Sequence, residues 1–90
     1  MENLIVIAGG GNYPRHVVEG AKKAGVSRVD VLAVKGSTER ATCKAADGVH
    51  WITLGGIAEG IRWMGGKGYD GAILAGQINP LSLFRGRFDD

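Results

Sequence analysis

The chain has little of several features that would define its class at once. Its single cysteine, Cys43, excludes an internal disulfide and fits a reducing compartment. Eleven basic and nine acidic residues leave a net charge of only +2, and no basic run marks a nucleic-acid surface. No apolar stretch approaches the roughly 20 residues of a membrane span, and the amino terminus does not resemble a secretory signal. These absences favour a cytoplasmic protein.

Residues that commonly perform catalysis or bind metals do not form a recognisable set. His16 and His50 have neither a histidine partner four residues away nor a nearby cysteine, so the sequence predicts no zinc site. Asp30, Asp47 and Asp70 lie inside or just before predicted strands, at the edge of the sheet away from the expected ligand site. We expect no catalytic residue in this chain.

Glycine is the residue in excess. The chain has 16 among its 90 residues, more than twice the average usage of about 7%. The hydrophobic fraction of 44% and the charged fraction of 22% are ordinary for a soluble globular protein. This length suffices for one domain over residues 1–90 and leaves no room for a second.

Short apolar runs alternate with helical patterns along the chain. The predicted strands cover 4–8, 29–34, 49–54 and 72–75, and the predicted helices cover 13–24, 37–46 and 57–64. Because right-handed crossovers join parallel strands, this alternation predicts a Rossmann-like, three-layer α/β domain with the strand order 3-2-1-4. Thr38 is the expected cap of the middle, weakest helix.

The helical spacing also predicts which side chains are buried. The first helix should bury a stripe of Val17, Val18, Ala21 and Ala24, and the third a stripe of Ile57, Ile61 and Met64. We expect Trp51 to pack inside. Trp63 is off the stripe of the third helix and is a candidate for packing or for contact with a partner.

Two glycine turns follow strands that this order places side by side. The first runs from Gly9 to Pro14 and opens a helix, and the second runs from Gly76 to Pro80. Glycines let a ligand approach the main chain, and the first amides of a helix attract anions, so the pair predicts a phosphate or nucleotide site at the switch point. The candidate binding residues are Gly9, Gly10, Gly11, Asn12, Gly76, Gln77 and Asn79.

The side chains near these turns have alternative interpretations. Asn12 and Asn79 could contact a ligand or cap the helices that follow them. Lys35, Arg85 and Arg87 are expected near the same edge, where each could bind phosphate or lie in solvent.

The first turn also suggests a nicotinamide dinucleotide, but imperfectly. Its pattern keeps two glycines of the dinucleotide fingerprint and has Pro14 at the third position. Lys35 stands where an acidic residue would bind the ribose. A dinucleotide-binding domain of an oxidoreductase is one alternative, and an interaction module with purely structural glycines is another.

Three motifs in order resemble a known family. They are the first turn Ile7-Ala8-Gly9-Gly10-Gly11-Asn12-Tyr13-Pro14, the segment from Val49 to Gly55, and Ala75-Gly76-Gln77-Ile78-Asn79-Pro80 with Leu83-Phe84. Together they resemble the amino-terminal domain of the UDP-2,3-diacylglucosamine pyrophosphatases of lipid A biosynthesis. The resemblance covers essentially all 90 residues. One departure is Asn79-Pro80 where family members commonly carry Arg-Pro.

The resemblance implies a two-domain hydrolase of which this chain is the amino-terminal, Rossmann-like part. The family cleaves a pyrophosphate to give UMP and 2,3-diacylglucosamine 1-phosphate, with a divalent metal such as Mg²⁺ and catalytic acidic residues in the second domain. It implies no cofactor on this domain, and we expect residues 1–90 alone to be inactive.

The last residues of the chain are expected to need a partner. Leu81, Leu83, Phe84 and Phe88 are apolar and require cover. The candidates are the second domain, another copy of the chain, and the cytoplasmic face of the inner membrane. We favour the second domain.

Overall fold

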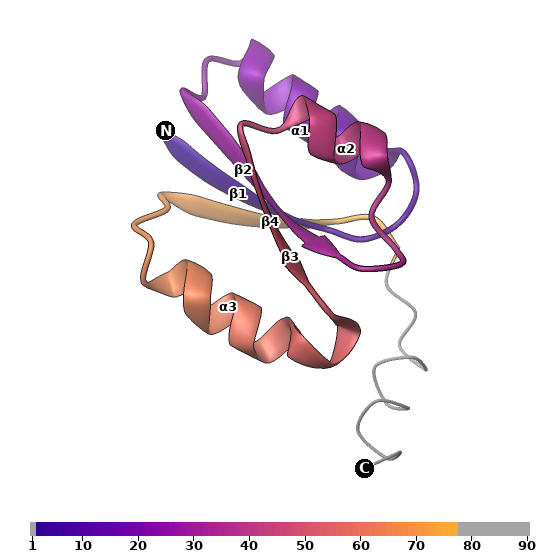
Figure 1. The fold of residues 1–90 in the computed structure, drawn as a ribbon. Helices are drawn as coiled ribbons and strands as arrows, with labels where there is room; N and C mark the ends of the chain where they lie inside the picture. The colour runs from indigo at the N-terminus through magenta and orange to yellow at the C-terminus, as the bar shows by residue number, and fades with distance from the viewer. Residues whose placement is uncertain (1, 78–90) are drawn as a thin grey trace.

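A four-stranded parallel sheet forms the centre of the computed structural model, which describes residues 2–77. The order is β3-β2-β1-β4, and all three neighbouring pairs are parallel (Figure 1). This is the predicted order, and the Rossmann-like α/β fold is confirmed. The strands are β1 (Asn3–Ala8), β2 (Arg28–Val34), β3 (Gly48–Ile52) and β4 (Gly71–Ala75).

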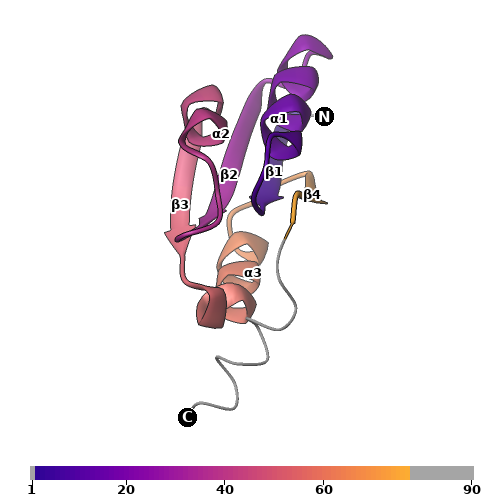
Figure 2. The ribbon, with the colours of Figure 1, turned by 90° about the vertical axis from the view of Figure 1, so that its right-hand side faces the viewer.

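The helices cover both faces of this sheet. In Figures 1 and 2, α1 (Tyr13–Lys23) and α2 (Arg40–Ala45) lie on one face, and α3 (Ile57–Gly65) lies on the other. A short 3₁₀ turn, Leu54–Gly56, leads into α3. The change of face follows from the order, because a right-handed crossover from edge strand β3 to the opposite edge must pass over the far side. No helix within residues 2–77 is long and apolar enough to cross a membrane.

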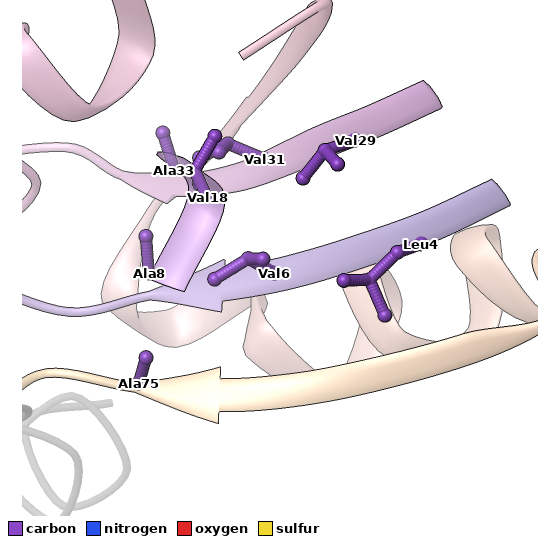
Figure 3. Close-up of a cluster of buried hydrophobic side chains, with 8 residues drawn as sticks. All are labelled: Leu4, Val6, Ala8, Val18, Val29, Val31, Ala33 and Ala75. Carbon is purple, nitrogen blue, oxygen red and sulfur yellow. The ribbon is translucent and has the colours of Figure 1, made fainter. Parts of the chain in front are cut away.

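The face beneath α1 holds the larger apolar core. Val18 of α1 is fully buried and points toward alternate residues of β1 and β2 (Figure 3). Alternate residues of a strand share a face, and β1 is apolar at every position from Leu4 to Ala8, so it can supply both faces. The buried residues of this core are Leu4, Val6, Ala8, Val18, Val29, Val31, Ala33 and Ala75.

The opposite core packs under α3, which approaches the sheet closely at a glycine. A Cβ at Gly60 would lie 3.2 Å from side-chain atoms of both Ile52 and Leu32. Gly60 is buried, whereas Ile61 is 46% exposed. The predicted stripe through Ile61 is therefore wrong, because the close contact at Gly60 turns the next residue outward. Trp63 packs against this core, together with Ile57 and Met64.

Three further expectations need correction. Trp51 is 46% exposed, because it lies on edge strand β3 on the face that the short α2 covers. Ala24 follows the end of α1 and is exposed. Thr38 does not cap α2. The residue before that helix is Glu39, whose side chain makes no capping hydrogen bond, and the Thr38 hydroxyl is engaged elsewhere.

Edge strand β4 is much less covered than its neighbour β1. Ile73 is 40% exposed and Leu74 66% exposed, although both are apolar. Only Ala75, at the carboxyl end of the strand, is buried. This end is where β4 meets the first glycine turn.

Candidate functional site

The structure joins the two glycine turns directly. We call Gly9–Asn12 and Gly76–Gln77 together the turn pair. Gly9 N donates to Ala75 O at 2.8 Å, and Gly10 and Gln77 form an isolated antiparallel bridge. The predicted adjacency of the two turns is therefore present, and their ligand-binding role stays a prediction.

Close main-chain packing accounts for two of the candidate glycines. A Cβ at Gly9 would lie 2.6 Å from the carbonyl oxygen of Gln77. Gly76 has φ +93°, and a Cβ there would lie 2.7 Å from both Gly10 O and Pro14 Cγ. Neither position has room for a larger residue, and Gly76 also adopts a conformation that L-residues avoid.

The unpaired amides lie further along the first turn than Gly9 and Gly10. The amides of those two glycines donate to Ala75 O and Gln77 O. Among residues 2–77, no acceptor faces the amides of Gly11, Asn12 or Tyr13, and the first bond of α1 runs from His16 N to Asn12 O at 3.3 Å. The geometry therefore makes the Gly11–Tyr13 amides, rather than those of Gly9 and Gly10, the available anion donors.

Space and charge around these amides also favour an anion. Gly11 has φ +83°, and a Cβ there would meet nothing within 4 Å. The first turn of α1 contains no acidic residue, so no carboxylate of the helix occupies its positive end.

Of the two candidate asparagines, only Asn12 lies within the described residues. Asn12 is at the N-cap of α1 and is exposed, but its side chain makes no capping hydrogen bond. The capping interpretation of Asn12 is therefore wrong, and its side-chain amide makes no hydrogen bond within residues 2–77. Asn79 lies outside the described residues, as do Arg85 and Arg87.

The loop after β2 lies beside the turn pair. Lys35 is exposed at the carboxyl edge, and its amide donates to Ile52 O at 2.8 Å. The carbonyl oxygen of Ser37 lies 3.2 Å from the position of a Cβ on Gly10. The Thr38 hydroxyl donates to Ala8 O at 2.6 Å and accepts from Val34 N at 2.8 Å. Thr38 thus joins the ends of β1 and β2, a role that the sequence pattern did not predict.

Acidic residues at the amino edge of the sheet hold its loops. Asp47 accepts from Val29 N at 2.8 Å and pairs with Lys22, and these contacts lower the pKa of its carboxyl group. Asp70 accepts from the amides of Asn3 and Glu2, which lowers its pKa in the same way. Both lie away from the turn pair, as predicted.

The described residues do not fit the divalent metal that the resemblance implies. Within residues 2–77, no three His, Cys, Asp or Glu side chains come together in a way that could hold a metal ion. Cys43 is half-buried against the α1-side core, and burial raises the pKa of its thiol. It is therefore a packing residue in this structure.

The fold and the turn pair define a Rossmann-like α/β domain with its two glycine turns joined at the carboxyl edge, where β1 and β4 meet. Comparison with protein families then gives a specific assignment. The chain belongs to the family described as the LpxI N-terminal domain, whose model matches residues 3–90. This is a domain related to lipid A biosynthesis, so the expected pathway is confirmed. Searches of curated proteins and of solved structures found no significant match.

Proposed function

We propose that the chain is the substrate-binding domain of a UDP-2,3-diacylglucosamine pyrophosphatase and that its turn pair contacts the pyrophosphate. The observation that carries this proposal is that the amides of Gly11, Asn12 and Tyr13, at the switch point of the sheet, have no hydrogen-bond acceptor among residues 2–77. Membership of the LpxI N-terminal domain family supports the choice of substrate.

The binding chemistry follows from the geometry of the first turn. The three amides donate to phosphate oxygens, and the positive end of α1 adds a favourable field. The exposed Asn12 side chain can donate to a phosphate or accept from a sugar hydroxyl. Lys35 supplies a positive charge at the same edge of the sheet.

The chain binds and orients, and bond cleavage belongs to another domain. Hydrolysis of the pyrophosphate gives UMP and 2,3-diacylglucosamine 1-phosphate. The described residues offer neither an acid cluster nor a metal site for that step, so we assign them none of it. The family is itself described as an amino-terminal domain, which supports a two-domain enzyme. We place such an enzyme at the cytoplasmic face of the inner membrane.

A UMP titration followed by amide NMR tests the binding role. We expect saturable shifts at the resonances of Gly11, Asn12 and Tyr13, and these three resonances report the affinity of the turn pair. Asn12→Asp places a carboxylate among the donors, so UMP affinity should fall at least tenfold, about 1.4 kcal/mol. The matched control Ala24→Asp adds the same charge at an exposed position after the end of α1 and should stay within twofold. Unchanged affinity in Asn12→Asp would contradict the proposal.

Two further measurements separate this function from the alternatives. NAD and NADP should show no saturable binding by calorimetry, whereas tight binding of either would favour an oxidoreductase domain. The 90-residue chain should not hydrolyse UDP-2,3-diacylglucosamine, and measurable turnover would show that the chemistry lies within it.

A further inference from the structure

A cavity opens at the amino edge of the sheet, opposite the turn pair. It has a volume of about 400 Å³ and lies on the α3 face, between the starts of β1 and β2, the strand β3 and the end of α3. We call it the amino-edge cavity. It is separate from the turn pair, so a ligand bound in it would be independent of the proposed function.

Arg28 is held in this cavity by a buried carboxylate. Its Nε lies 3.0 Å from Asp30 Oδ1 and 3.2 Å from Asp30 Oδ2, and Tyr69 donates its hydroxyl to Oδ2 at 2.6 Å. The Asp30 side chain is only 12% exposed, whereas the Arg28 side chain is 55% exposed. Asp30 and Tyr69 therefore fix the guanidinium from behind and leave its outer side open.

The main chain of β3 makes room for this arginine. A Cβ at Gly48 would lie 2.7 Å from Arg28 Nη2 and 2.8 Å from Asp30 Oδ1. Among residues 2–77, neither Nη atom of Arg28 has a hydrogen-bond acceptor. A guanidinium fixed through Nε with free Nη donors is suited to a phosphate or carboxylate.

A flat wall and a second cation line the same cavity. The rings of His50 and Trp63 stack with centroids 3.9 Å apart and planes 7° apart. Lys67 Nζ lies 5.3 Å from the centroid of the Trp63 ring. Stacked aromatic rings are a common support for the flat ring of a ligand.

The charges lining the cavity favour an anionic ligand. Arg28 and Lys67 are cationic, and Asp30 already accepts hydrogen bonds from Arg28 and Tyr69. Asp30 Oδ1 has no hydrogen-bond partner among residues 2–77 but is buried, so the hydrogen-bonding groups open to a ligand are donors. The volume exceeds what a phosphate group alone requires and leaves space for a ring beside His50.

We propose that the amino-edge cavity binds a nucleoside monophosphate. The Nη atoms of Arg28 and the ammonium of Lys67 contact the phosphate, and the base lies along the stacked His50–Trp63 pair. Asp30 and Tyr69 act as positioning residues for Arg28.

Tryptophan fluorescence tests this on the full 90-residue chain. The sequence has two tryptophans, so Trp51→Phe leaves Trp63 as the only reporter. Titration with AMP should change its emission saturably, and ribose 5-phosphate should bind at least fivefold more weakly. In this background, Arg28→Gln should weaken AMP binding at least tenfold and Lys67→Gln at least threefold. Lys44→Gln, on α2, should stay within twofold.

Two controls keep the result decisive. Circular dichroism confirms that each variant is folded. Arg28→Lys keeps the positive charge but loses the paired Nη donors of the guanidinium, so it should bind AMP with intermediate affinity. Asn12→Asp at the turn pair should leave the Trp63 response unchanged. The proposal is overturned if AMP gives no saturable response, if it binds no better than ribose 5-phosphate, if Arg28→Gln binds as well as its parent, or if Asn12→Asp abolishes the response.

Discussion

Gly10 and Gln77 exchange two main-chain hydrogen bonds, from Gly10 N to Gln77 O at 2.9 Å and from Gln77 N to Gly10 O at 3.3 Å. This antiparallel bridge joins the two turns just beyond the ends of the parallel strands β1 and β4. It holds the two turns against each other and uses the amide of Gly10. The amides without an acceptor among residues 2–77 are therefore those at the start of α1.

The contact between the turns should make Gly9 and Gly76 intolerant of alanine. Gly9→Ala introduces a clash with the Gln77 main chain and should cost about 1–3 kcal/mol of unfolding free energy. Gly76→Ala should cost more, because its positive φ adds about 1–2 kcal/mol. Gly11→Ala is the control, since it has the positive φ without the clash. Urea unfolding measures all three, and equal losses in Gly11→Ala and Gly76→Ala would contradict the close contact.

Two helical glycines should respond differently to alanine. Gly20 lies in α1 with nothing within 4 Å of a new Cβ, so Gly20→Ala should stabilise the domain by about 0.5–1 kcal/mol. Gly60→Ala gains the same helix propensity but places its Cβ 3.2 Å from Ile52 and Leu32, so we expect no net gain. Thermal unfolding compares the two. A similar rise in Tm for both would show that α3 packs less closely than described.

Tyr69 should make the domain sensitive to alkaline pH. Burial, and then the hydrogen bond to Asp30, raises the pKa of Tyr69 from 10 to about 12. Because the folded pKa exceeds the unfolded one, this stabilisation is complete below pH 10 and is lost as the pH rises to about 12. Between these values, the unfolding free energy should fall more steeply in the parent than in Tyr69→Phe.

Tyr69→Phe should also have a lower unfolding free energy than the parent at neutral pH. Removing the hydroxyl deprives the buried Asp30 carboxylate of a donor, at a cost of about 1.5–3 kcal/mol. Tyr13→Phe is the matched control, because Tyr13 is 64% exposed, and it should change neither the stability nor its pH dependence. A parent and Tyr69→Phe with identical alkaline profiles would be inconsistent with the described contact.

Asp70 should contribute to stability only above acidic pH. Its carboxylate accepts from the amides of Asn3 and Glu2, which lowers the folded pKa below the ordinary value of 3.8. The stabilisation is therefore present above pH 3.8 and is lost as the pH falls through the lowered pKa. Asp70→Ala should have a lower Tm than the parent at pH 7, and this difference should shrink at acidic pH. A constant difference would indicate a role independent of charge.

The strands and their order could be predicted because each depends on a local pattern. The run from Leu4 to Ala8 is apolar at every position, as a strand covered on both faces must be. The alternation of strands with helices and the right-handedness of crossovers then predicted that β1 and β4 are neighbours. The expected link to lipid A biosynthesis followed from motifs that are contiguous in the sequence.

The remaining details depend on contacts between distant segments. The donors of Gly9 and Gly10 are used by β4 and the turn after it, a fact set by the register that pairs Ala8 with Ala75. Gly60 faces the core but has no side chain, so the apolar pattern of α3 could not identify it as an inward-facing position. Asp30 and Tyr69 are 39 residues apart, and only the fold brings them together.

The exposure of β4 gives the turn pair a thermodynamic link to the sheet edge. A weakly covered edge strand opens more readily than the central strands, and its opening would remove the acceptors of the Gly9 and Gly10 amides. A ligand that needs the closed turn pair must therefore also favour the ordered edge. A ligand bound at the turn pair should slow hydrogen exchange along β4, at residues that the ligand never touches.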